Sequence, residues 1–442
     1  MSKELFAIAE AAARTRGVRG IEVIFGRHNE ALTRFANNTI HQNVAEIDHA
    51  ISIRISEDHR TARVSTNRLH RDSVEAAVEQ AIALTRASNP DETLPDLADA
   101  DSVPRLDRYY ASTASATPSI RAAGVADAIR IVEGAGQIAA GIFETCEFHE
   151  SIFNSRGVAV EHAGTLAKFS ITAMAADSSG WAKATNADLA EIDPRELATI
   201  AMGKARDSRN PREIAPGRYT VILEPAAVLD LVGQMFADFS ATALSDKRSF
   251  LTDRLHAKLF GDNISITDDV RHPLQTGAPF DGEGMPRTSL RLVEAGVPKE
   301  IAVSRSAAAK SKLVATGHGF PLPNEAGEAP VNIVIGGGAS HIDEMIRSTA
   351  HGVLVTRLWY IREVDPHEKM MTGMTRDGTF LIEGGQVTCG LRNFRFNQSL
   401  IEMLSNVEAL SPSVRASGEE AFDMVVPAMK VAGFHFTEVT RF

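Results

Sequence analysis

Residues 49–56 of the chain are HAISIRIS, and this stretch alternates strictly between two kinds of side chain. The isoleucines share one face of an extended strand, and the small and charged residues share the other. Such alternation is typical of an antiparallel strand with one face in a core and one face toward water. The turn Glu57-Asp58-His59 leads into a further alternating run at Thr61–Ser65. The stretch therefore predicts a meander of antiparallel strands.

The segments on either side of this meander extend the pattern. Apolar residues at helical spacing predict a helix over Lys3–Arg16, and a β-branched run predicts a strand over Ile21–Phe25. Asn29 and Glu30 predict a turn, with a second strand at Ala31–Ile40. A helix with Ser73 as its N-cap follows, over Ser73–Ala87.

A second unit with the same order of elements follows the first. Ser88–Thr117 is rich in Asp, Pro, Ser and Ala, which predicts a linker or a crossing loop. A helix then starts near Ser119, and strands are expected at Gly141–Phe148 and Ser151–Asn154, before a helix at Pro194–Asp207. The repeated order suggests an internal duplication, although we find no residue-level identity to support it.

The last part of the chain is richest in short strands. A strand at Arg218–Leu223 precedes a helix at Glu224–Phe236, another strand is expected at Gly352–Leu358, and Thr379–Glu383 pairs with Gln386–Cys389 as a hairpin. We therefore predict an α+β fold, with an N-terminal helix-plus-antiparallel-sheet region and a mostly antiparallel β domain at the C-terminus. Three units are expected, at residues 1–105, 106–215 and 216–442.

Composition excludes several classes of function without selecting a chemistry. The 442 residues carry 46 Lys and Arg against 57 Asp and Glu, a net charge of −11. That balance argues against a nucleic-acid binder and against a polybasic membrane anchor. Two cysteines are too few for a disulfide framework, and the N-terminus lacks the pattern of a signal peptide. We expect a cytoplasmic protein that binds neither nucleic acid nor membrane.

Residue motifs alone leave the chemistry open. His149-Glu150 and His367-Glu368 could begin a zinc-binding helix, but neither pair is followed by a second histidine four or five residues after the first. Asp281-Gly282-Glu283-Gly284 places two carboxylates on a Gly-rich loop. Asp281 and Glu283 could bind a cation or a peptide amine, or could form a solvated turn.

The order and spacing of a further set of segments resemble the TldD/PmbA family over nearly the whole chain. The segments are Ile21–Phe25, Arg63-Val64-Ser65-Thr66, Tyr219–Leu223, Phe280–Gly284, Ala315-Thr316-Gly317, Gly352–Thr356 and Leu381–Gly385. The resemblance implies one of two kinds of subunit. The TldD kind carries a helical H-E-x-x-x-H and is a zinc metallopeptidase acting on unfolded peptides. The PmbA kind, also called TldE, lacks that motif and pairs with TldD.

The position of the missing motif decides between the two kinds. Counting from the matching strand, it should fall at Gly233-Gln234-Met235-Phe236-Ala237-Asp238. Gly233 and Asp238 stand where histidines would be, and Gln234 stands where glutamate would be. No histidine occurs between Ala163 and Leu255, so the departure does not depend on the exact register. Glutamine cannot act as a general base, and one aspartate is a poor zinc site.

The resemblance therefore implies a non-catalytic TldE/PmbA-like subunit without a cofactor of its own. Zinc would lie in a TldD-like partner, and the two chains would hold a peptide substrate in a shared cavity as a heterodimer. Two alternatives stay open. One is a stand-alone metallopeptidase with unconventional ligands among His318, His341, His351 and His367. The other is a homodimeric regulatory protein that binds gyrase or a toxin–antitoxin protein.

Overall fold

The first six strands of the chain form one sheet in the order β3-β2-β1-β4-β5-β6, and every neighbouring pair is antiparallel. The computed structural model describes residues 1–440. The strands are β1 (Ile21–Ala36), β2 (Thr39–Glu57), β3 (Arg60–Thr66), β4 (Ile138–Asn154), β5 (Ala159–Met174) and β6 (Ser179–Asn186). The helices are α1 (Ser2–Thr15), α2 (Arg71–Ala87), α3 (Ala111–Ala114), α4 (Pro118–Gly134) and α5 (Pro194–Asp207), with a 3₁₀ turn η1 (Leu189–Glu191).

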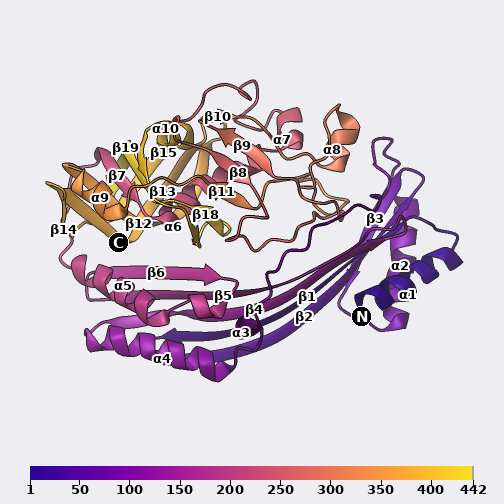
Figure 1. Cartoon of the computed structure of the whole chain (residues 1–442), viewed down its shortest axis with the longest axis horizontal. Helices are drawn as coiled ribbons and strands as arrows, with labels where there is room; N and C mark the ends of the chain where they lie inside the picture. Colours follow the sequence, from indigo (N-terminus) through magenta and orange to yellow (C-terminus); the bar gives the residue numbers. More distant parts are fainter. Residues whose placement is uncertain (441–442) are drawn as a thin grey trace.

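Two helix pairs cover opposite ends of this sheet (Figure 1). Helices α1 and α2 pack on the isoleucines of the opening alternation, Ile51, Ile53 and Ile55. Helices α4 and α5 pack on an aromatic group that includes Phe143 and Phe169. The element order helix, three strands, helix thus occurs twice around the central pair β1 and β4. Between the helix pairs the strands stay open to solvent, and Ile47 on β2 is 58% exposed.

The C-terminal half contains two further sheets. One has six strands in the order β10-β9-β8-β11-β18-β17, and the other has seven, β12-β7-β19-β15-β13-β14 with β16 beside β19. The strands are β7 (Gly217–Leu223), β8 (Ile266–Asp268), β9 (Leu290–Glu294), β10 (Val297–Pro298), β11 (Ile333–Ile335), β12 (His351–Asp365), β13 (Met370–Glu383), β14 (Gln386–Gly390), β15 (Phe394–Ser399), β16 (Val407–Leu410), β17 (Val414–Ala416), β18 (Met424–Val426) and β19 (Met429–Val439). The short helices are α6 (Pro225–Val232), η2 (Gly233–Asp238), α7 (Ala241–Ser245), α8 (Arg305–Lys310), α9 (Ile342–Arg347) and α10 (Leu400–Ser405).

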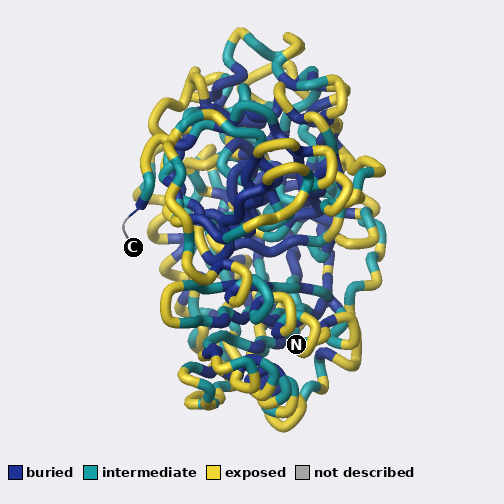
Figure 2. The backbone as a smooth tube through the Cα atoms, turned by 90° about the vertical axis from the view of Figure 1, so that its left-hand side faces the viewer, coloured by how far each residue is buried: buried dark blue, intermediate teal, exposed yellow. Residues whose placement is uncertain are grey.

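Both C-terminal sheets and helix α6 contribute to one large apolar core, and Figure 2 shows these buried segments gathered in the upper part of the molecule. Most strand pairs are antiparallel, and the pairs β7–β12 and β11–β18 are parallel. The α+β prediction is therefore confirmed, with a helix-plus-antiparallel-sheet region first and a mostly β region after it. No helix among the described residues is long and apolar enough to cross a membrane.

Two predicted interruptions of the first sheet are wrong. Asn29 and Glu30 lie inside β1, which continues to Ala36, and the turn falls instead at Asn37-Asn38, where both residues have positive φ. His149 likewise lies inside β4 rather than between two strands. The reason is common to both sites. Neither helix pair covers the middle of the sheet, so polar residues occur there within continuous strands.

Candidate functional site

The segment predicted to correspond to the zinc motif is not a regular helix. Helix α6 ends at Val232, and Gly233–Asp238 continues as the 3₁₀ turn η2. A Cβ atom built on Gly233 would overlap the Cβ of Ala421 and lie 3.1 Å from the Met424 methyl group. Any larger side chain at this position would therefore displace the segment before β18. The structure leaves no room for a histidine at Gly233.

The neighbouring side chains are engaged by that same segment. The Gln234 amide nitrogen donates to the backbone carbonyls of Asp230 (3.3 Å) and Glu420 (3.2 Å). Asp230 Oδ1 accepts hydrogen bonds from the backbone N–H groups of Glu419 and Glu420, at 3.0 and 2.9 Å. Burial raises the pKa of Asp230 to about 6, against the opposing effect of those N–H donors. The segment before β18 thus closes over α6 and η2.

Asp238, the third position of the motif, is paired inside the protein. Its carboxylate forms an ion pair with Lys369, whose ammonium group also lies 2.6 Å from Glu363. Its other oxygen accepts from the Phe250 N–H at 3.1 Å. Burial raises the pKa of Asp238 even though Lys369 opposes that shift. A zinc ion needs about three nitrogen, sulfur or oxygen ligands from the protein. The three motif positions do not supply them, because Gly233 has no side chain, Gln234 is bonded to backbone carbonyls and the Asp238 carboxylate is paired with Lys369.

The alternative ligand set does not converge. Across residues 1–440 there is no group of three or more His, Cys, Asp and Glu side chains that could hold a metal ion. His318 is fully buried with its Nε2 3.4 Å from Asp268, whereas His367 contacts Arg254 in an exposed turn. His341 caps α9, and His351 begins β12. Each histidine has a different local environment.

The carboxylates of the 281–284 loop are buried rather than solvated. Asp281 Oδ1 accepts from the N–H groups of Glu283 (2.9 Å) and Met285 (3.0 Å), and Oδ2 accepts from the N–H of Gly319 (2.9 Å). The interpretation as a solvated turn is therefore wrong. Burial raises the pKa of Asp281 against these donors and against Arg287. Peptide binding by Asp281 and Glu283 stays a prediction.

Glu283 joins the two halves of the molecule through a buried cluster of charges. Its carboxylate lies 2.9 Å from Arg305 and 3.9 Å from Arg54, which projects from β2. Arg54 in turn lies 3.6 Å from Glu22 on β1, and Glu22 lies 2.5 Å from Arg63 on β3. Glu22, Arg54 and Glu283 are all 0% exposed. Loss of hydration raises the pKa of Glu283 to about 7, and Arg305 only partly opposes that shift.

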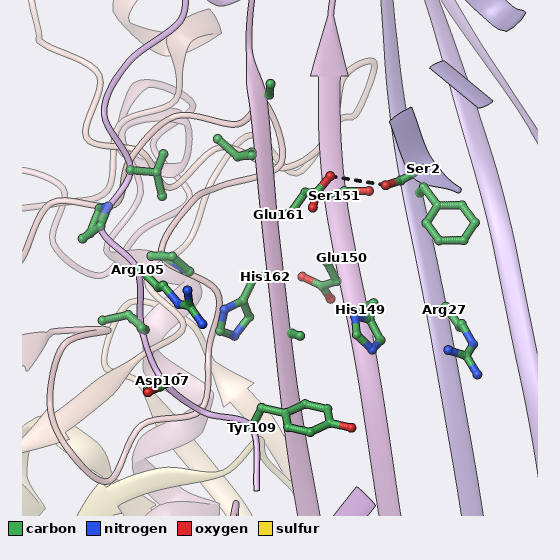
Figure 3. A pocket seen from close by; sticks show the side chains of 18 of the residues that line it. Ser2, Arg27, Arg105, Asp107, Tyr109, His149, Glu150, Ser151, Glu161 and His162 are labelled. Carbon is green, nitrogen blue, oxygen red and sulfur yellow. Dashed lines mark hydrogen bonds between the residues drawn. The ribbon is translucent and has the colours of Figure 1, made fainter. Parts of the chain in front are cut away.

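A cavity lies where the first sheet meets the loop between α2 and α3 (Figure 3). We call residues 98–109 of that loop the strap. The cavity has a volume of about 810 Å³. Its walls come from the strap, from β1, β4 and β5, from the start of α1 and from Pro279. The predicted linker is thus a crossing loop that forms one side of a pocket, which we call the strap pocket.

Side chains from both faces of the sheet reach the strap pocket. His149 Nε2 and the Tyr109 hydroxyl each lie 3.1 Å from Glu147 Oε1, and these groups lie on the face that carries the helices. Glu150 and His162 are directly opposite each other on β4 and β5 and lie on the face toward the C-terminal half. Burial lowers the pKa of His162 to about 4, with Arg108 and His149 contributing, so its imidazole is neutral near pH 7.

The sequence does not predict this group of residues. Its motifs indicate His149 only as a possible zinc ligand on a helix, and they indicate no role for Tyr109, Glu147 or His162. The only available signal was the position of polar residues inside otherwise apolar strands.

Two domain models of one protein family match the chain. The model of the PmbA/TldA metallopeptidase C-terminal domain matches residues 216–438, and that of the PmbA/TldA metallopeptidase domain 1 matches residues 21–85. The first match alone spans half of the chain. It includes both Asp281–Glu283 and the segment Gly233–Asp238.

Individual relatives agree with these matches. A metalloprotease PmbA homolog from Haemophilus influenzae is 23% identical over 435 residues, which cover 91% of each chain. A metalloprotease from Methanothermobacter thermautotrophicus is 23% identical over 61% of each chain. The crystal structure of TldE from Thermococcus kodakarensis superposes with a TM-score of 0.89 at 20% identity, covering 99% of both chains, so the two proteins share one fold.

Proposed function

The chain belongs to the TldD/PmbA family of metallopeptidases, and from this premise we propose that it is the non-catalytic TldE/PmbA-like subunit of a heteromeric zinc metallopeptidase. In this proposal a TldD-like partner supplies the zinc ion and the general base. The present chain completes the chamber in which an unfolded or modified peptide is held. We place the complex in the cytoplasm.

The observation that carries the proposal is the way the motif position is filled. Gly233 packs against Ala421, Gln234 bonds to backbone carbonyls, and Asp238 pairs with Lys369. Each of these contacts engages a motif position within the protein, so that the position offers no free zinc ligand or general base. A site that had only lost one ligand would keep the remaining geometry. Here the segment before β18 occupies the space, which supports a structural role.

The proposal is tested by reconstitution. The chain is purified alone, mixed with a TldD-like protein that keeps H-E-x-x-x-H, and analysed by size-exclusion chromatography, metal analysis and cleavage of an unfolded peptide. We expect a heteromeric complex whose zinc content matches the partner alone, and cleavage only when the partner is present. A Glu→Gln change in the partner's motif should abolish cleavage by the complex.

The alternatives give different results in the same experiment. Stoichiometric zinc and peptide cleavage by this chain alone would support a stand-alone metallopeptidase and refute the proposal. A stable homodimer that does not associate with the TldD-like protein would favour a regulatory protein that binds gyrase or a toxin–antitoxin protein.

A further inference from the structure

Positive charge gathers where the strap meets the C-terminal half. The Arg108 guanidinium on the strap donates to the His272 carbonyl at 3.0 Å, and that of Arg415 on β17 donates to the Leu274 carbonyl at 3.0 Å. The two guanidinium groups therefore contact the same short loop. Arg108 forms no ion pair with any residue in 1–440, and Arg415 pairs only with Asp423, at 3.3 Å. Two arginines thus share one carboxylate.

His162 on β5 lies beside Arg108. Arg108 forms a parallel bridge with Gly164, and His162 is two residues before Gly164, so the two side chains lie on the same face of the sheet. Burial lowers the pKa of His162, and the Arg108 charge adds to that effect. Burial also lowers the pKa of Arg415; Asp423 opposes that shift and the Arg108 charge adds to it. Arg108 is therefore close to both groups.

Three buried nitrogen atoms of this group lack a hydrogen-bond partner within residues 1–440. They are Nε of Arg108, Nε of Arg415 and Nε2 of His162. His162 is 6% exposed, and the Arg415 side chain is 7% exposed. Buried polar atoms normally have partners. Because a guanidinium nitrogen is always a donor, the partner missing from the two arginines is an acceptor.

Arg105 adds a further positive charge from the strap. It lines the strap pocket together with His162, and Figure 3 shows the two side chains pointing toward each other between the strap and β5. Arg105 is exposed and forms no hydrogen bond or ion pair with any described residue. The acids that line the pocket are Asp101, Asp107, Glu150 and Glu161. None of them contributes to the pKa shift of His162, whose causes after burial are the charges of Arg108 and His149.

We propose that Arg105, Arg108, His162 and Arg415 bind a phosphate dianion, either free or as an ester of a small molecule, at the wall of the strap pocket. Guanidinium groups form charge-assisted, often bidentate hydrogen bonds to phosphate oxygens. Donors that come from the strap, from β5 and from β17 suit an oxyanion with several oxygens. The net charge of −11 disfavours nucleic acid as the source of the phosphate, and about 810 Å³ accommodates the organic part of an ester. The inference goes beyond the proposed function, because it involves neither zinc nor a partner.

Binding is measured by isothermal titration calorimetry on the full chain in a phosphate-free, low-salt buffer at pH 7. The probes are inorganic phosphate and glycerol 3-phosphate, with acetate as the carboxylate control. We expect one phosphate per chain and no saturable binding of acetate. Tighter binding of glycerol 3-phosphate than of inorganic phosphate would identify an ester as the ligand, and the reverse would identify free phosphate; either result supports the site.

Variants and an NMR titration locate the bound phosphate. Arg105→Gln should weaken binding by about tenfold or more, since a charge-assisted hydrogen bond is lost. Arg195→Gln, which changes an exposed arginine on α5 that also has no ion pair among residues 1–440, should not. A dianion beside His162 favours its imidazolium form, so phosphate should raise the midpoint of the His162 titration by about 1 pH unit or more.

Four results would each overturn the proposal. They are no saturable binding of either phosphate, equally tight binding of acetate, unchanged affinity in Arg105→Gln, and a His162 midpoint that phosphate does not move.

Discussion

Neutralising Glu283 is expected to stabilise the protein at high pH and to have little effect at low pH. The carboxyl group lies in the buried cluster between the first sheet and the C-terminal half, where burial raises its pKa from 4.5 to about 7. The folded state therefore binds a proton more tightly than the unfolded state does. The stability linked to this proton is present in full below pH 4.5 and is lost as the pH rises through 7.

The magnitude follows from the separation of the two pKa values. Each unit of separation corresponds to 1.36 kcal/mol, so a rise from 4.5 to about 7 corresponds to about 3 kcal/mol between the two pH limits. For a chain of 442 residues that unfolds as one unit, about 3 kcal/mol shifts Tm by about 3 °C. Glu283→Gln keeps the acceptor for Arg305 but removes the titration.

The assay is calorimetry of the wild type and of Glu283→Gln between pH 5 and 8.5. We expect the Tm of the variant minus that of the wild type to grow by about 3 °C as the pH rises. Glu325→Gln, at an exposed loop position, is the matched control and should follow the wild type at every pH. If the difference stays constant, or shrinks with rising pH, then Arg54 and Arg305 outweigh the loss of hydration and the reasoning is refuted.

Lys369→Met leaves the Asp238 carboxylate buried without its cation. We therefore expect the free energy of unfolding, measured by urea denaturation, to fall by about 3–5 kcal/mol. Adding Asp238→Asn should restore much of this loss, because it removes the unpaired charge. The triple change Gly233→His, Gln234→Glu, Asp238→His should not bind stoichiometric zinc by metal analysis, because the segment before β18 fills the position; a folded variant with one zinc would contradict this. Burial lowers the pKa of His162 to about 4, so the stability linked to its neutral form is present above pH 6.5 and is lost as the pH falls toward 4. NMR titration of the imidazole checks this, and a midpoint near 6.5 would show that it is hydrated.

The sequence predicted the type of each major element better than its limits. The isoleucines of residues 49–56 form the buried face of β2, as their alternation indicates. The predicted turn at Asn29 and Glu30 failed because these residues lie where β1 crosses the uncovered middle of the sheet. Where a core covers one face of a sheet, the alternation of apolar and polar side chains identifies the buried face of a strand. Where neither face is covered, two adjacent polar residues within a strand look like a turn in the sequence.

The two candidate sites also differ in how far the sequence alone could predict them. Gly233, Gln234 and Asp238 could be found by counting along one segment from one strand. The strap pocket depends on the register of β4 against β5, which places Glu150 opposite His162, and on a loop that returns to the edge of β5 from α2. Neither relation leaves a local signal in the sequence, because the residues involved are separated by long intervals and share no spacing.

The strap pocket and the buried charge cluster are connected by one loop. Pro279 lines the pocket, and Phe280 packs on Ile152 and Val160 of the strands that form its wall. Glu283, three residues after Phe280, enters the cluster with Arg54. The cluster therefore fixes the C-terminal half against the same face of the sheet that carries His162 and Glu150. Buried ion pairs contribute little net stability but penalise other arrangements, since separating the halves would leave charges unpaired. We infer that the cluster holds the pocket wall in position, which ties the geometry of the strap pocket to the docking of the two halves.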